Sequence, residues 1–120
     1  MREALLVGVG GFLGAVARYG VGVGMRPWTA TFPWHTLTIN VVGCFLIGCL
    51  VPLVEHRPHW FLFLVPGVLG GFTTFSSFGH ESVALAQGGR GVLAALYVLA
   101  SVLAGLGACW GARLMASAPK

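Results

Sequence analysis

Residues 60–86, WFLFLVPGVLGGFTTFSSFGHESVALA, form a long apolar stretch that contains an unusual polar segment. About 20 mainly apolar residues are enough to cross the hydrocarbon core of a membrane, so this stretch is long enough to span one. Two adjacent glycines, Gly70 and Gly71, are followed there by four hydroxyl residues. Glycine disfavours a continuous helix, and a glycine pair favours a break at that point. We therefore predict a membrane span whose helix is broken.

Three further apolar stretches have the length of a membrane span. They run approximately from Ala4 to Gly24, from Thr36 to Val54 and from Gly91 to Met115. The connections between the four stretches contain turn-forming prolines or glycines together with single charges, as in Arg26-Pro27 and Gly89-Arg90. The sequence therefore predicts an all-α membrane protein with four transmembrane helices, the third of them broken, in one domain over residues 1–120.

The composition excludes several other classes of protein. Only 8% of the 120 residues are charged, against roughly 25% in an ordinary soluble domain. A soluble chain this short must cover most of its surface with polar side chains, and these are missing. The seven Lys and Arg residues are scattered singly, so no basic stripe follows a phosphate backbone. The chain is neither a cytosolic domain nor a nucleic-acid binder.

The cations are divided almost evenly between the two ends of the predicted bundle. Four spans place both termini and the middle loop on one side. That side carries Arg2, Arg57, Arg113 and Lys120, and the other carries Arg26 and Arg90, with Arg18 near its interface. A membrane protein is oriented by the difference in Lys and Arg between the loops on its two sides. Here four cations lie on one side and two or three on the other, which is a weak bias. We therefore predict that the chain inserts in both orientations.

Polar residues within the second and fourth spans share narrow faces. Thr36 and Asn40 are four residues apart, which places them on one side of a helix. The same four-residue spacing joins Tyr97, Ser101 and Gly105. They form a narrow polar stripe along the helix that ends at a residue without a side chain. Uncompensated polar groups are costly inside a membrane, so these side chains need partners or a pathway. For Asn40 alone, interhelical bonding and pore lining are equally open.

Aromatic rings alternate with the hydroxyl residues of the broken segment. Phe72, Phe75 and Phe78 recur every three residues and lie roughly along one face. A ring has a positive edge, so ring edges beside hydroxyl donors can stabilise a small desolvated anion. Glu81 follows the hydroxyl run and is the only acidic residue within the four predicted spans. Arg18 can snorkel to the interface or line an anion vestibule.

Four segments together resemble the Fluc (CrcB) family of fluoride channels. They are GFLGAVARY at residues 11–19, TLTINVVGCFLIG at 36–48, GVLGGFTTFSSF at 67–78, and Tyr97 with Ser101. The segments occur in the family's order and cover essentially the whole chain. The Gly-Gly-x-Thr-Thr-Phe-Ser-x-Phe pattern is far more specific than a lone glycine motif.

The resemblance implies an antiparallel, dual-topology homodimer of four-helix subunits with two fluoride pores. Such a channel would lie in the plasma or inner membrane of a prokaryote. It would passively export fluoride and so protect the cell from its toxicity. The resemblance also implies a structural sodium ion at the dimer interface, held by the backbone carbonyls of Gly70 and Thr73.

The resemblance further implies roles for eight side chains. They are Phe75 and Phe78 as rings that face fluoride, Asn40 as an amide donor, Thr36, Tyr97 and Ser101 as a polar track, Arg18 in a basic vestibule, and Glu81 near a pore mouth. The chain departs from the family at two positions. Gly105 stands where the track of relatives can continue with a hydroxyl, and Cys44 stands where many relatives have Ser.

Two other functions predict different residues. A small proton-coupled multidrug exporter, also a four-span dual-topology protein, needs a glutamate in its first span, and the predicted first span has none. A non-transporting assembly subunit predicts scattered single polar contacts, whereas these residues are concentrated. An enzyme is not expected, because no nucleophile is paired with a base and no metal-binding motif is present.

Overall fold

The structure is a computed structural model that describes residues 1–116, and every regular element in that range is a helix. Four helical stretches are long and apolar enough to cross a membrane: Arg2–Gly24, Trp34–Val54, Pro58–Gln87 and Gly91–Ala116. The prediction of four spans is confirmed. Lys120 and the last residues of the predicted 1–120 domain lie outside the described part of the chain.

The first, second and fourth spans are each one continuous helix, and the third is a succession of shorter ones. The elements are α1 (Arg2–Gly24), the 3₁₀ turn η1 (Arg26–Trp28), α2 (Trp34–Val54), α3 (Pro58–Leu62), the π-helix η2 (Phe63–Leu69), α4 (Gly70–Phe72), α5 (Phe75–Gln87) and α6 (Gly91–Ala116).

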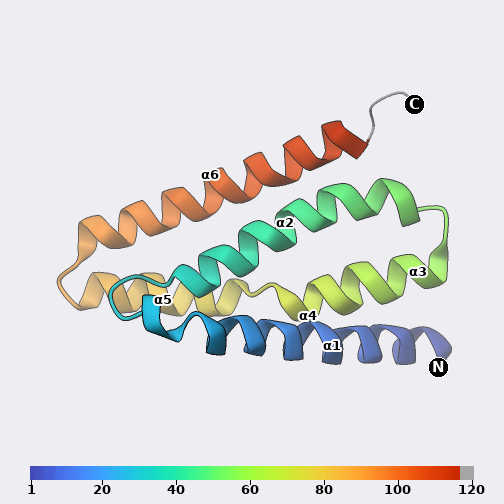
Figure 1. The fold of residues 1–120 in the computed structure, drawn as a ribbon, viewed down its shortest axis with the longest axis horizontal. Coiled ribbons are helices and arrows are strands. Elements are labelled where there is room, and N and C mark those ends of the chain that lie inside the picture. Colours follow the sequence, from blue (N-terminus) through green and yellow to red (C-terminus); the bar gives the residue numbers. More distant parts are fainter. Residues whose placement is uncertain (117–120) are drawn as a thin grey trace.

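The helices run up and down and form a flat bundle (Figure 1). The most extensive contacts join α2 to α6 and α1 to η2, with α5 packed on α6. The thinnest dimension is 21 Å, about two helix diameters. Both ends of the described chain lie beside the turn between α2 and α3, and the 25–33 loop and the α5–α6 turn lie at the opposite end (Figure 1).

Glycines allow α1 to lie directly against the third span. Gly10 and Gly14 are buried, and a side chain on them would overlap the backbone of Phe63 or Val68. Two other pairs of glycines at four-residue spacing do not pack within the chain. The pairs Gly20/Gly24 and Gly107/Gly111 have no neighbouring atom within 4 Å of an added Cβ.

The third span departs from a regular helix at two places. Around Pro66 the backbone adopts the π-helix η2, a wider register that accommodates the missing proline N–H. The helix then continues through Gly70 and Gly71. Gly71 lies against α1, where a side chain would collide with the Gly11 backbone. The non-helical residues are Thr73 and Thr74, a few positions beyond the glycine pair.

Candidate functional site

Thr73 and Thr74 form an extended linker between α4 and α5. Their backbone angles are φ −80°, ψ 158° and φ −151°, ψ 113°. The Asn40 side chain on α2 makes hydrogen bonds to both the backbone N–H and the backbone carbonyl of Thr74. Its Nδ2 donates to the Thr74 carbonyl at 3.1 Å, and its Oδ1 accepts from the Thr74 N–H at 2.9 Å. Asn40 thus gives the Thr74 N–H the acceptor that it lacks outside a helix, and one Nδ2 hydrogen remains for another acceptor.

The Thr74 hydroxyl begins α5. It accepts from the Ser77 N–H at 3.2 Å, the bond that an N-cap residue makes to the first turn of a helix. In a continuous helix the Ser77 N–H would instead bond the Thr73 carbonyl, and the Thr74 N–H would bond that of Gly70. Both carbonyls have therefore lost their helical donors. The Thr73 carbonyl accepts from Arg18 Nη1 at 3.3 Å.

A cavity of about 370 Å³ lies beside the linker, against α2, the third span and α6. Six of the ten residues predicted for the site line it: Asn40, Gly70, Thr73, Phe75, Phe78 and Ser101. The Ser101 hydroxyl is buried without a hydrogen-bond partner among the described residues. Cys44 also lines this cavity, and its Sγ is 3.3 Å from the position of a Cβ on Gly105.

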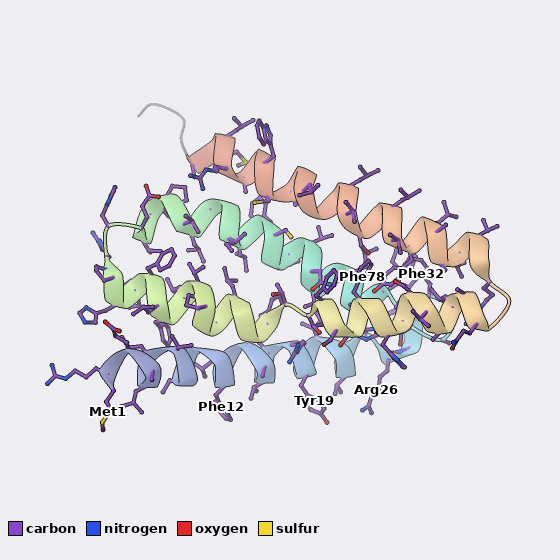
Figure 2. The ribbon with its side chains drawn as sticks, turned by 180° about the vertical axis from the view of Figure 1, so that it is seen from behind. Met1, Phe12, Tyr19, Arg26, Phe32 and Phe78 are labelled. Atoms are coloured by element: carbon purple, nitrogen blue, oxygen red, sulfur yellow. The ribbon has the colours of Figure 1, made fainter. Side chains whose placement is uncertain are left out.

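The two phenylalanine rings differ in their surroundings. Their centroids are 5.5 Å apart with the planes inclined by 45°. Phe78 also packs on Tyr97 at 5.3 Å and points from α5 into the bundle, toward Phe32 (Figure 2). Phe75, in contrast, is 83% exposed on the single chain. One wall of the cavity is therefore an aromatic side chain that this chain alone does not cover.

A second cluster of predicted residues is built around the carboxylate of Glu81 on α5. Thr36 Oγ1 donates to its Oε1 and Tyr97 Oη donates to its Oε2, each at 2.8 Å. The exposed fractions of Thr36 and Tyr97 are 1% and 0%. Because α2 and α6 each supply one donor, the carboxylate joins three spans. Polar stripes that looked separate in the sequence therefore meet at one acid.

His35 belongs to this cluster and was not predicted for the site. Its Nε2 lies 3.3 Å from Glu81 Oε1 and 3.2 Å from Thr36 Oγ1. In the sequence it is a histidine at the end of a span, a position that signals no partner. The sequence shows that His35 is next to Thr36. Its contact with Glu81, 46 positions later, depends on how α2 and α5 are arranged in the fold.

Arg18 lines a second cavity of about 350 Å³, on the other side of the linker. This cavity also contains Thr36, His35 and Arg26, so two arginines and an imidazole surround it. Thr74 lines both cavities. The linker held by Asn40 therefore lies between a basic cavity and the cavity lined by phenylalanines.

These features define a class: a small four-span membrane protein whose polar interior surrounds an interrupted helix, as in channels and transporters. A family model described as "CrcB-like protein, Camphor Resistance (CrcB)" matches residues 5–113. The chain belongs to the CrcB family, and the resemblance found in its motifs is confirmed.

Several relatives are similar over nearly their whole length, and each is named a fluoride-specific ion channel, FluC. The relative from Agrobacterium fabrum is 52% identical over 113 residues, which cover 90% of each chain. That from Chlorobium chlorochromatii is 51% identical over 105 residues, 84% of this chain and 81% of the relative. That from Caulobacter vibrioides is 46% identical over 122 residues, 97% and 96% of the two chains. These names describe ion channels and not enzymes or exporters.

Proposed function

We propose that the protein is a fluoride-selective channel that lets fluoride leave the cell passively and so protects it from fluoride toxicity. The observation that supports this most is the cavity in which Asn40, Ser101, Phe75 and Phe78 meet beside the linker. Its lining offers uncharged donors and aromatic rings to an anion. The names of the similar proteins point to the same ion.

The chemistry of this lining suits a small, strongly hydrated anion. A selective path must replace the hydration shell with several close donors. The free Nδ2 hydrogen of Asn40 and the unpartnered Ser101 hydroxyl are two such donors, and ring edges supply further positive charge. The membrane potential drives the anion out of the cell, with a free energy of about 2.3 kcal/mol per charge per 100 mV. No coupled proton is needed, so the proton-coupled exporter is not favoured.

The functional unit in this proposal is an antiparallel, dual-topology homodimer in the plasma or inner membrane of a prokaryote. Phe75 supports it, because a pathway residue that is 83% exposed needs a second surface to enclose it. The glycine pairs Gly20/Gly24 and Gly107/Gly111 leave further close-approach surfaces unused within the chain. The balanced loop cations allow both orientations.

A structural sodium ion at the dimer interface is part of the same proposal. The carbonyl oxygens of Gly70 and Thr73 have lost their helical donors, and such hard oxygen atoms suit a hard cation. Two carbonyls from each of two subunits would give four ligands. The Arg18 guanidinium, 3.3 Å from the Thr73 oxygen, would have to share that carbonyl with the ion. The bound ion would supply positive charge that holds the two linkers together.

The function is tested by halide efflux from liposomes that contain the purified protein. We expect fluoride to leave much faster than chloride, and faster than from protein-free vesicles. Equal rates for the two halides, or no rate above the protein-free vesicles, would exclude a fluoride channel. The sodium site is tested separately, by replacing sodium with N-methylglucamine. The thermal stability of the dimer should fall, and unchanged stability would argue against the ion.

A further inference from the structure

His35 places a titratable ring against the carboxylate that joins three spans. Its Nε2 is 3.3 Å from Glu81 Oε1, and the two side chains are 31% and 20% exposed. The Glu81 carboxylate already accepts hydrogen bonds from Thr36 and Tyr97. A protonated imidazole at this distance adds a positive charge to the cluster, whereas a neutral one adds none.

His35 lines the basic cavity and also a third cavity of about 210 Å³, which contains Glu81 and Arg90. The other charged or titratable groups of these two cavities and of the Glu81 cluster are Arg18 and Tyr19 on α1, Arg26 in η1, Arg90 in the α5–α6 turn, Glu81 on α5 and Tyr97 on α6. Arginine keeps its charge at every physiological pH, and tyrosine stays neutral there. Histidine is the side chain that ordinarily changes charge between about pH 5 and pH 8. His35 is therefore the group in this set that would make the charge near Glu81 depend on pH.

The second ring nitrogen supports a role toward an anion. Nδ1 of His35 is buried and has no hydrogen-bond partner among the described residues. When the ring is protonated, both nitrogens carry N–H groups. One then faces the Glu81 carboxylate, and the other has no acceptor among residues 1–116. The protonated ring thus holds a charged donor, in a residue that lines the basic cavity, that the protein itself does not satisfy.

We propose that His35 is a further residue of the fluoride pathway, and that its protonation compensates the charge of Glu81 so that fluoride passes the carboxylate more readily. The inference rests on the proposed function and adds a pH dependence to it. An unpaired carboxylate repels an approaching anion, and the repulsion is strong where water is scarce. A proton on His35 weakens that repulsion without breaking the bonds from Thr36 and Tyr97. Fluoride export would then be fastest at acid pH.

The test is the fluoride current in planar bilayers with the same pH on both sides. Electrical current is the suitable measurement, because neutral HF that crosses lipid at acid pH carries none. We expect the wild-type current to rise roughly tenfold from about pH 8 to about pH 5.5, equivalent to about 1.4 kcal/mol. His35→Gln should remove this rise. His35→Lys, with a permanent charge, should keep the alkaline current near the acid level.

The exposed histidine His59 on α3, far from Glu81 in the sequence, gives the matched control. His59→Gln should retain the full pH dependence. A wild-type current that is flat or falls at acid pH would overturn the role of His35, although the protein would still be a fluoride channel. A rise that persists in His35→Gln would assign the effect to another group and also overturn it. No fluoride current at any pH would overturn the proposed function and this inference together.

Discussion

The bond pair between Asn40 and Thr74 provides the most quantitative test of the site. Thr74 is 8% exposed, and its N–H and carbonyl are both bonded to the Asn40 side chain, at 2.9 and 3.1 Å. Asn40→Ala would leave the Thr74 N–H buried without a partner, and it would remove one bond from the carbonyl, which as the N-cap carbonyl of α5 also accepts from the first turn of that helix. The unsatisfied N–H costs about 1–3 kcal/mol and the lost bond to the carbonyl about 1 kcal/mol, so the expected loss of folding free energy is about 2–4 kcal/mol.

The same substitution should affect transport, because Asn40 fixes the linker from which α5 begins. Without it, Phe75 loses its fixed position in the cavity wall and one donor disappears from the cavity. We expect fluoride efflux to fall at least about tenfold, the effect of about 1.4 kcal/mol on a barrier. Asn40→Asp keeps the acceptor for the Thr74 N–H but sets a carboxylate against its carbonyl. It should abolish flux while the dimer still assembles.

Thermal unfolding in detergent and fluoride efflux from liposomes measure the two effects. Thr38→Ala is the matched control, since Thr38 lies on the same helix and its hydroxyl makes no hydrogen bond to the described residues. It should leave both measurements near wild type. If Asn40→Ala lowers stability by less than about 1 kcal/mol and retains full flux, the bond pair does not hold the linker and the reasoning is refuted.

Phe75→Ile should reduce fluoride efflux at least about tenfold by removing a ring edge, whereas Phe12→Ile, on the outer side of α1 (Figure 2), should not. Equal efflux from the two variants would contradict the role of the ring. Gly14→Ala should destabilise the protein by about 1–3 kcal/mol because the new methyl group meets the Val68 carbonyl, and Gly8→Ala, with open space around it, should be neutral. Equal stability would show that α1 does not pack as described. A small thiol reagent should slow efflux by modifying Cys44 in the cavity, and Cys44→Ser should prevent this. Inhibition that persists in Cys44→Ser would place the reactive thiol elsewhere.

Much of the fold could be predicted from residue type and spacing alone. Apolar length fixed the four spans, because a membrane helix needs few signals beyond about 20 apolar residues. The cost of burying polar groups also identified Asn40, Tyr97 and Ser101 as residues that need partners. Their spacing placed them on helical faces, and six predicted residues do line one cavity.

The pairings between helices could not be predicted, because they depend on how the spans rotate against one another. Nothing local shows that Asn40 bonds the backbone of Thr74, 34 positions later, or that His35 reaches Glu81. The exact position of the linker was missed for the same reason. The glycine pair favoured a break at residues 70–71, but Gly71 is instead used for contact with α1, and the extended residues follow it.

The central claim is passive conduction of fluoride, and the reversal potential of the current measures it most directly. Purified protein in a planar bilayer is placed between solutions with tenfold gradients of fluoride and of protons in the same direction, with chloride equal on both sides. Because the two ions carry opposite charges, their equilibrium potentials then have opposite signs. We expect the current to reverse at the fluoride equilibrium potential, roughly 59 mV for a tenfold gradient of a singly charged ion. A reversal potential that follows the proton gradient, or one that stays near zero, would contradict it.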